Sequence, residues 1–386
     1  MAVKTAPTRL STLVAAVVAI IGEMNGVIIE RETEITLCWT ALLAGANMIF
    51  FGVPGTAKSM LVNRLADHVP DARYFAVLLM RDMATDAVFG PPDLKQLKLG
   101  EYGRNYENYL PTADIGFVDE VGKAPTGILN SMLTIMNEKT FTDKGKRVKV
   151  PLMSLFGASN ELIGAKELDA IRDRFALKAE VHPLSDSGMR QLLDVEDALP
   201  TPIHTITKED LAYLREQTRQ VVVPPAIKDS LIKLRADLRN QGFEPSDRRF
   251  KECTRLLKAK ALLDGREAVN QDDLDILSHV MWEKPENKQA VTSTVAKLGN
   301  PLKVKATEEY DKAFTVFKNA DGMSTDASKF TELQTAVFEA RTSFKKITDG
   351  LVALKDANPG SDHKHIDDTL AKVRQFNARL LEKIES

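Results

Sequence analysis

Residues 52–59 read Gly-Val-Pro-Gly-Thr-Ala-Lys-Ser. An apolar run at 47–51 precedes them and a helical pattern of apolar residues follows, so a buried strand is predicted to turn into a helix. This order is typical of a phosphate-binding loop, in which backbone N–H groups and the positive end of the helix face one anion. Lys58 would serve the outer phosphates and Ser59 would ligate Mg²⁺. The alternative is an ordinary glycine-rich turn.

A second apolar run, residues 115–118, ends in two adjacent carboxylates, Asp119 and Glu120. Adjacent strand residues point to opposite faces, so we expect the two acids to have different roles. Asp119 is predicted to hold Mg²⁺ through water, and Glu120 to orient and deprotonate the attacking water. A solvated strand end is the alternative, but the upstream loop in the same chain favours ATP hydrolysis.

A third apolar run, residues 150–156, leads to Asn160. An asparagine at the carboxyl end of a central strand is expected beside the γ-phosphate, so Asn160 is the predicted γ-phosphate sensor. Further on, Arg172 and Arg174 are two residues apart and diverge on a helix. One can reach a neighbour's phosphate while the other pairs locally, although surface arginines are commonly only solvated or salt-bridged.

The ordered motifs resemble those of the MoxR-type AAA+ ATPases, and most closely the subfamily called regulatory ATPase variant A (RavA). Besides the loop, they include Val88-Phe89-Gly90-Pro91, Tyr109-Leu110-Pro111, Val118-Asp119-Glu120, Ile128-Leu129-Asn130, Met136-Asn137-Glu138, Ser159-Asn160-Glu161-Leu162 and Ser246-Asp247-Arg248-Arg249. The resemblance covers roughly the first three-quarters of the chain. Proteins of this family share an alanine at the position of Ala57, where the general loop pattern has a second glycine.

The resemblance implies a role for each matching residue. The predicted cofactor-binding residues are Gly52, Val53, Pro54, Gly55, Thr56, Ala57, Lys58 and Ser59, with Ser59 and Asp119 at the Mg²⁺. The predicted catalytic residues are Glu120, Asn160, Arg174 as arginine finger, and Arg248 as the sensor 2 arginine of the lid. Arg172 and Arg249 are the alternatives to these arginines. Because an arginine finger acts on the ATP of the next subunit, a closed homo-oligomeric ring, a hexamer by resemblance, is expected.

Composition agrees with a packed soluble enzyme. The chain has 386 residues, 44% of them hydrophobic, and a net charge of −2, which argues against a general nucleic-acid binder. Cys38 and Cys253 are predicted to be buried free thiols of a reducing compartment. The apolar run 13–21 is too short to span a bilayer, and its helical spacing predicts a buried helix. We therefore expect a cytoplasmic protein without membrane insertion.

The predicted fold class is α/β: a P-loop parallel sheet with helices on both faces, then an all-α lid and a C-terminal antiparallel helical bundle. The predicted domains are the core at 1–183, the lid at 184–285 and the bundle at 286–386. Within the core, residues 84–110 correspond by resemblance to the helix-2 insert, a β-structured projection. Residues 138–150 are predicted to form the hairpin before sensor 1. The candidate partner-contacting side chains of these two segments are Tyr102, Tyr106, Tyr109, Lys144, Lys146 and Arg147; surface decoration is the alternative.

The C-terminal region carries two apolar seams with steps of three and four residues. The first comprises Phe330, Leu333, Val337, Ala340, Phe344, Ile347, Leu351 and Leu354, and the second Ile366, Leu370, Val373, Leu380 and Ile384, with polar Asn377 at one position. Residues 358–360 are the predicted turn, and a helix carrying Tyr310, Phe314 and Phe317 supplies a third face. The seams are interpreted as core rather than docking surface. His363 and His365 lack an evident third metal ligand and are interpreted as solvated.

The sequence thus predicts a ring-forming, chaperone-like ATPase that uses ATP and Mg²⁺ to remodel a protein partner. By resemblance, that partner is a von Willebrand factor A domain protein. The β-rich partner-binding insertion of RavA proteins has no counterpart in the sequence. Two alternatives stay open: a DNA-associated motor using basic hairpin residues, and a scaffold that nucleotide merely locks.

Overall fold

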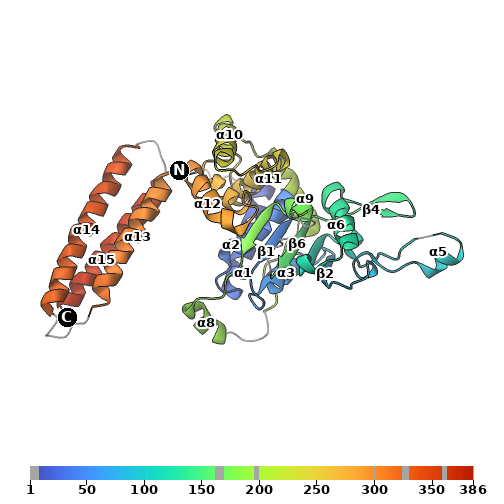
Figure 1. Cartoon of the computed structure of the whole chain (residues 1–386), viewed down its shortest axis with the longest axis horizontal. Helices are drawn as coiled ribbons and strands as arrows, with labels where there is room; N and C mark the ends of the chain where they lie inside the picture. Colours follow the sequence, from blue (N-terminus) through green and yellow to red (C-terminus); the bar gives the residue numbers. More distant parts are fainter. Residues whose placement is uncertain are drawn as a thin grey trace. The chain divides into compact units, whose positions relative to one another are not determined.

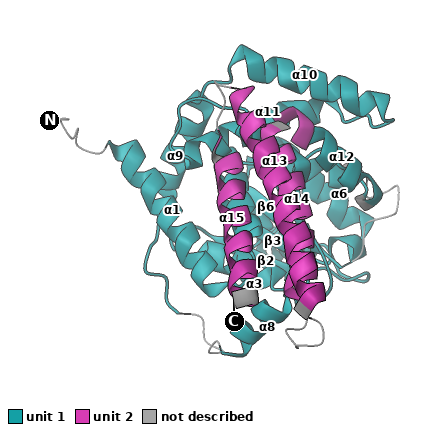
Figure 2. Cartoon of the chain, turned by 90° about the vertical axis from the view of Figure 1, so that its left-hand side faces the viewer, with its two compact units in different colours: residues 1–295 teal, residues 296–386 magenta. Residues whose placement is uncertain are grey.

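The computed structural model describes residues 8–101, 103–160, 169–194, 200–299, 301–323, 330–358 and 363–385. They form two compact units, residues 1–295 and 296–386, which are coloured separately in Figure 2. Each unit is described by itself. Predictions that fall on Tyr102, Glu161, Leu162, Pro359 and Gly360 lie outside the described residues.

The first unit is built on a five-stranded parallel sheet in the order β2-β3-β6-β1-β7 (Figure 1). The strands are β1 (Met48–Phe51), β2 (Tyr74–Leu78), β3 (Ile115–Asp119), β6 (Ser154–Ser159) and β7 (Leu177–Glu180). All residues of β1 and β6 are buried, as expected for parallel strands covered on both faces. Phe51 pairs with Ser159, so the loop after β1 and Asn160 after β6 leave the same edge of the sheet.

Helices flank this sheet, which confirms the predicted fold class. Those of the core are α1 (Arg9–Val27), α2 (Glu32–Ala44), α3 (Lys58–Asp67), α6 (Thr126–Glu138) and α7 (Asp169–Arg174), with the 3-10 turn η2 (Val121–Lys123).

The two cysteines are buried free thiols, as predicted, and burial raises the pKa of both.

The N-terminal helix α1 packs on the core by one face. Val17, Ile20 and Met24 are fully buried, and the Trp39 indole lies 3.3 Å from the Met24 sulfur. Among the described residues, α1 alone is long and apolar enough to cross a membrane, and 22% of this apolar stretch is buried, so the helix predicted to be buried is covered on one face only. Length and composition are weak evidence for a span, because a core helix meets the same criterion.

The segment that resembles a helix-2 insert contains short helices rather than the expected β-structure. It holds α4 (Asp86–Phe89), α5 (Leu94–Lys98) and η1 (Leu110–Thr112), and a single bridge joins Pro92 to Arg104 in its described part. Helix α5 begins where the Asp93 carboxylate accepts hydrogen bonds from the N–H groups of Lys95 and Gln96. Asp93 therefore caps a short helix where the resemblance implied β-structure.

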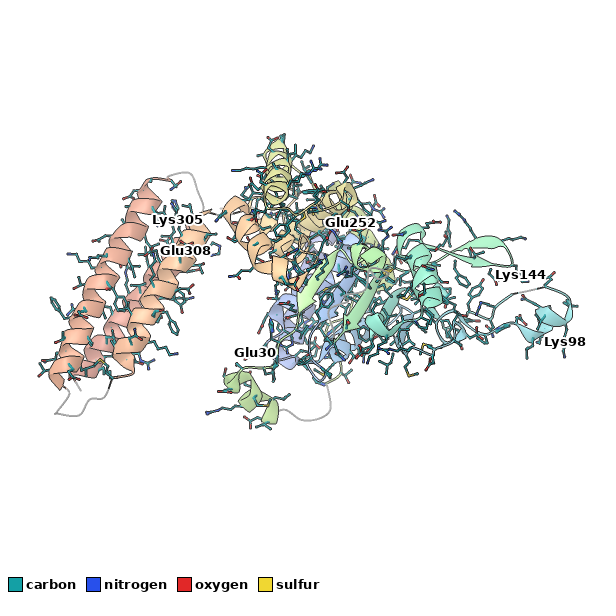
Figure 3. All side chains as sticks on the ribbon, viewed as in Figure 1. Glu30, Lys98, Lys144, Glu252, Lys305 and Glu308 are labelled. Carbon is teal, nitrogen blue, oxygen red and sulfur yellow. The ribbon has the colours of Figure 1, made fainter. Side chains whose placement is uncertain are left out.

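The segment predicted as a hairpin contains β4 (Thr140–Asp143) and β5 (Lys146–Lys149). Lys144 and Gly145 have φ angles of 50° and 72°, as in the two-residue turns that match strand twist. The turn lies against the insert, because Lys144 pairs with Glu101 at 3.0 Å and Asp143 accepts from the Arg104 N–H. Figure 3 labels Lys144 in this hairpin and Lys98 in the insert.

The helices after the sheet are α8 (Asp186–Leu193), α9 (Lys208–Gln220), α10 (Pro225–Asn240), α11 (Asp247–Leu263), the 3-10 helix η4 (Asp272–His279) and α12 (Pro285–Gly299). Helix α11 packs against α2, α9 and η4. The boundary between the compact units lies within α12, after Val295. The domain limits taken from the sequence stay predictions.

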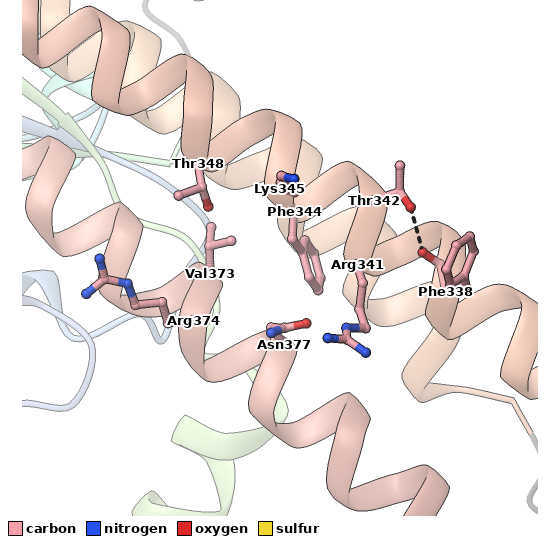
Figure 4. Close-up of a pocket in the computed structure, with 9 residues that line it drawn as sticks. All are labelled: Phe338, Arg341, Thr342, Phe344, Lys345, Thr348, Val373, Arg374 and Asn377. Carbon is pink, nitrogen blue, oxygen red and sulfur yellow. Dashed lines mark hydrogen bonds between the residues drawn. The ribbon is translucent and has the colours of Figure 1, made fainter.

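The second unit is a three-helix bundle of α13 (Pro301–Asp321), α14 (Phe330–Asp356) and α15 (Lys364–Glu385). Both seams supply its core, including Leu333, Val337 and Leu380. The apolar spacing predicted Asn377 at a seam position. In the structure, the neighbouring Phe376 packs against the core and stacks on Phe317 with ring centroids 4.6 Å apart. Asn377 instead lines a groove of about 430 Å³ between α14 and α15 (Figure 4).

His363 and His365, which were interpreted from the sequence as solvated, are both half-buried. His363 contacts the Asn358 carbonyl oxygen through Nε2 at 2.8 Å.

Replacing Phe376 with alanine should destabilise the bundle by about 2–3 kcal/mol, because its half-buried ring contacts four aromatic neighbours. The matched control is Phe338→Ala, since that ring is 72% exposed and its loss should cost under about 0.5 kcal/mol. Hydrogen exchange in α13–α15 measures both. Equal protection in the two variants would contradict the packing described.

Candidate active site

The loop between β1 and α3 is shaped by close approach and by left-handed backbone. A Cβ at Gly52 would lie 2.2 Å from the Val181 carbonyl oxygen, so only glycine fits there. Gly55 and Ala57 have φ angles of 79° and 66°. The alanine that departs from the general loop pattern thus adopts a conformation that favours glycine.

Helix α3 directs its amino end at the space enclosed by this loop. Its first backbone bond runs from the Leu61 N–H to the Ala57 carbonyl oxygen. The N–H groups of Lys58, Ser59 and Met60 therefore precede the intrahelical ladder and are donors for an anion. A loop with this curvature and this donor set fits the phosphates of a nucleotide.

The Lys58 ammonium group lies inside the loop and connects it to β6. It donates to the carbonyl oxygens of Gly52 and Val53 at 2.7 and 2.8 Å, and to Asn160 Oδ1 at 3.2 Å. Burial lowers its pKa, whereas the carboxylates of Asp119 and Glu120 raise it. The side chain is 7% exposed, so its charge acts where solvent screening is weak.

The two predicted carboxylates face one cavity instead of opposite sides of the sheet. Asp119 is the last residue of β3, but Glu120 leaves the strand in the left-handed conformation, with φ 54° and ψ 46°. Its N–H donates to Asp119 Oδ1 at 2.9 Å. The expectation from strand alternation was therefore wrong at this step, because the strand ends one residue earlier.

Asn160 joins the predicted base to the loop lysine. Its Nδ2 donates to Glu120 Oε1, while its Oδ1 accepts from Lys58. Lys123 lies 3.3 Å from the other Glu120 oxygen. The Glu120 carboxylate is thus oriented from two sides, as a general base requires.

These residues line a cavity of about 670 Å³, a volume appropriate for a nucleotide. The lining residues from the loop and the strand ends are Val53, Pro54, Gly55, Thr56, Ala57, Lys58, Ser59, Asp119, Glu120 and Asn160. The other apolar lining residues include Val27, Ile28, Ile29, Pro183, Leu184, Met189 and Leu192. The first set fits phosphates and a hydroxyl- and carboxylate-bound Mg²⁺, and the second set fits a flat base.

Arg31, which also lines the cavity, and the adjacent Glu30 were not predicted from the sequence. Arg31 is 5% exposed and donates to the carbonyl oxygens of His182 at 2.6 Å and Thr56 at 3.4 Å. Glu30, labelled in Figure 3, accepts from the Ser185 N–H and hydroxyl at the start of α8, which lowers the pKa of its carboxyl. In the sequence, Glu30 and Arg31 appear only as an acidic and a basic residue before a helix, a pattern too common to indicate a site.

The predicted arginines lie elsewhere. Arg174 donates to Asp173 at 2.5 Å, and Arg248 donates to Asn137 at 2.6 Å; neither lines the cavity. Burial, and then the charge of Arg248, lower the pKa of Arg174. Arg248, predicted by resemblance as the sensor 2 arginine of the lid, thus lies outside the cavity in this structure, and its role stays a prediction.

The start of α11 is held in place by Arg249. Arg249, the alternative sensor 2 residue, is 4% exposed. It donates to the Phe175 carbonyl oxygen at 2.9 Å and to Asp173 Oδ1 at 3.1 Å. These bonds fix the start of α11 beside the end of α7, away from the loop.

Comparison with known families agrees with this geometry. Residues 15–216 match the model described as the MoxR domain in the MoxR-vWA-beta-propeller ternary systems, and residues 226–295 match an AAA lid domain. The chain belongs to the MoxR family of AAA+ ATPases. Membership implies nucleotide use. The RavA subfamily is not named by either match, so that finer assignment stays a prediction.

Individual relatives share most of this MoxR-family chain. One uncharacterised protein of Methanocaldococcus jannaschii is 39% identical over 72% of this chain and 74% of its own length. Another is 32% identical over 92% of this chain and 94% of its own. The chaperone MoxR1 of Mycobacterium tuberculosis is 22% identical over 67% of this chain and 72% of its own.

A solved structure supports the fold. The crystal structure of a presumptive ATPase from Cytophaga hutchinsonii covers 76% of this chain and 96% of its own, with a TM-score of 0.63 and 19% identity.

Replacing Arg249 with methionine should lower the free energy of unfolding of the first unit by about 3 kcal/mol, because a buried hydrogen-bonded guanidinium is lost. Arg248→Met is the control and should cost at most about 1 kcal/mol, since its single contact is exposed. Urea unfolding followed by the fluorescence of Trp39 and Trp282, both in this unit, measures the difference. Equal losses would show that Arg249 does not anchor α11.

Proposed function

We propose that the chain hydrolyses ATP to ADP and phosphate and uses the turnover to remodel a protein partner. The observation that carries the proposal is the convergence of Lys58, Asp119, Glu120 and Asn160 on one cavity. These residues come from three different strand ends, and chance would not assemble a lysine, two carboxylates and an amide beside a loop of free N–H groups.

Each of these residues has a place in phosphoryl transfer to water. The loop N–H groups and Lys58 would hold the phosphates, and Ser59 and Asp119 would hold Mg²⁺. Bound Mg²⁺ neutralises phosphate charge and assists departure of ADP. Asn160 would orient the attacking water, and the Glu120 carboxylate would accept its proton.

The proposed site is completed by a neighbouring subunit in a ring, taken as hexameric from the family resemblance. Arg174 and Arg248 do not line the cavity of their own chain, which supports a role for both on the ATP of the adjoining protomer. Such arginines stabilise the charge that develops on the transferred phosphoryl group. Oligomer formation would then be a requirement for turnover.

The proposed partner is a von Willebrand factor A domain protein. The description of the matched family model, the MoxR domain in the MoxR-vWA-beta-propeller ternary systems, supports this partner. The name of the related chaperone MoxR1 supports a chaperone-like role. We retain the RavA-like, chaperone-type role and the cytoplasmic location as parts of this proposal.

The alternative of a DNA motor receives less support. Two of the basic residues of the hairpin are already neutralised, since Lys144 pairs with Glu101 at 3.0 Å and Arg147 with Glu138 at 3.3 Å. Phosphate binding by a hairpin requires cations that are available to the backbone of the nucleic acid.

Glu120→Gln should lower steady-state ATP turnover by at least about 100-fold, because the base is lost, while ATP affinity changes by less than about threefold. With ATP, the same variant should retain a von Willebrand factor A protein that the wild type releases. Phosphate release, fluorescent-nucleotide binding and mass spectrometry of co-purified proteins measure these effects.

Glu244→Gln is the matched control, because Glu244 is an exposed carboxylate in the loop before α11. It should turn ATP over within about twofold of the wild-type rate. Undiminished turnover in Glu120→Gln would refute the role of Glu120 in hydrolysis. Full partner activity in Glu120→Gln despite lost turnover would favour the scaffold alternative.

A further inference from the structure

A small second pocket of about 60 Å³ lies in the first unit where α2, α9 and α11 meet. Helix α2 ends there at Ala44, shortly before β1 begins at Met48. The nucleotide cavity lies beyond the other end of β1, so the two sites are separated by the length of the strand. The function proposed above does not use this second pocket.

The pocket is lined by four cations. They are Arg215 and Arg219 of α9, and Arg255 and Lys258 of α11. A Cβ built on Gly45 would lie 2.4 Å from Arg215 Nη2 and 3.2 Å from Arg255 Nη2, so these two nitrogens are under about 6 Å apart. Two guanidinium groups at this separation repel each other.

Most of these cations have identifiable partners. Arg255 donates to the Ala44 and Gly45 carbonyl oxygens at 2.7 and 3.0 Å, at the negative end of α2, and pairs with Glu252, which is labelled in Figure 3. Arg219 pairs with Glu216, and Lys258 donates to the Arg219 carbonyl oxygen at 2.7 Å. Within the described chain, Arg215 has neither an ion pair nor a hydrogen-bond acceptor.

A fifth cation, Lys139 at the end of α6, adds to this imbalance. Its Nζ and the Arg215 Nε are both buried and find no acceptor among the described residues. Burial, and then the charges of Arg215 and Arg255, lower the pKa of Lys139 to about 8, whereas Glu252 opposes that shift. Burial, with Arg219 and Arg255, lowers the pKa of Arg215 to about 10. Both groups therefore remain charged at neutral pH.

Buried cations without a counter-ion are costly, and an anion that satisfies several of them at once removes the cost. The pocket volume is several times that needed by one water and is appropriate for one tetrahedral oxyanion. Guanidinium groups match the geometry of phosphate oxygens, since each presents parallel N–H donors.

We propose that Arg215 and Arg255 form a binding site for a single oxyanion of the phosphate class, separate from the nucleotide cavity, with Lys139 as a further positive charge nearby. The bound anion links the end of α2 in the core to α9 and α11 of the lid region. Since α11 also carries Arg248 and Arg249, occupancy of this site stabilises the arrangement of the lid helices on the core.

The test uses inorganic phosphate and the full chain carrying Lys58→Ala, which removes phosphate binding at the loop. Calorimetric titration at constant ionic strength should show one site in this background. Adding Arg215→Gln should weaken binding at least tenfold, whereas adding Arg239→Gln, a matched exposed arginine of α10, should change it less than twofold. If Arg215→Gln does not fold, Lys139→Gln serves instead and should weaken binding at least threefold.

The dependence on pH provides a second measurement. Sulfate keeps its charge between about pH 6 and 9, so a change in its affinity reports protein groups. The charged groups that act on Lys139 are Arg215 of α9 and Arg255 and Glu252 of α11. Sulfate affinity should therefore fall at least threefold as Lys139 loses its proton from pH 7 to 9, and Lys139→Gln should abolish this dependence.

Two results would overturn the proposal. One is the absence of phosphate binding in the Lys58→Ala background, or binding that neither Arg215→Gln nor Lys139→Gln weakens. The other is no phosphate binding together with a changed sedimentation coefficient of Arg215→Gln, which would show that a carboxylate of an adjoining copy neutralises this cluster. Neither result bears on ATP turnover, so the proposed function is tested separately.

Discussion

The candidate site depends on the hydrogen bonds that the ammonium group of Lys58 donates. It donates to two carbonyl oxygens of its own loop and to Asn160 at the end of β6, so one buried charge holds the loop after β1 to the neighbouring strand. Asn160 extends the connection to Glu120. The parallel register of β1 and β6 makes this possible, since it brings both strand ends to one edge.

Local patterns predicted the parts of the fold that are decided locally. The loop at 52–59, the hairpin turn at Lys144-Gly145 and the seams of α14 and α15 depend on glycine, on short polar turns and on apolar spacing, all of which a sequence displays. The secondary structure of the insert was harder to predict, because resemblance implied strands for a segment in which Asp93 caps a helix. Similarly, Phe376 and Asn377 are adjacent, and only packing against Phe317 decides which one enters the core.

The site was predictable where one strand end determines a side chain, and not where distant segments meet. Lys58, Asp119 and Asn160 lie where their strands end, but Glu120 reaches the cavity through a left-handed residue that alternation does not anticipate. Arg31 contacts His182 and Thr56, which are distant in sequence. Arg248 and Arg249 are adjacent, yet burial separates an anchor of α11 from an exposed cation.

The central proposal is that each nucleotide site is built from residues of two protomers. It is tested most directly by mixing two inactive variants, Glu120→Gln, which keeps Arg174, and Arg174→Ala, which keeps Glu120. In mixed rings, an Arg174→Ala protomer beside a Glu120→Gln protomer regains both groups at one site, so ATP turnover should recover to roughly a quarter of the wild-type rate by random assembly. Turnover that stays at the level of the separate variants, although mixed oligomers form, would contradict the account.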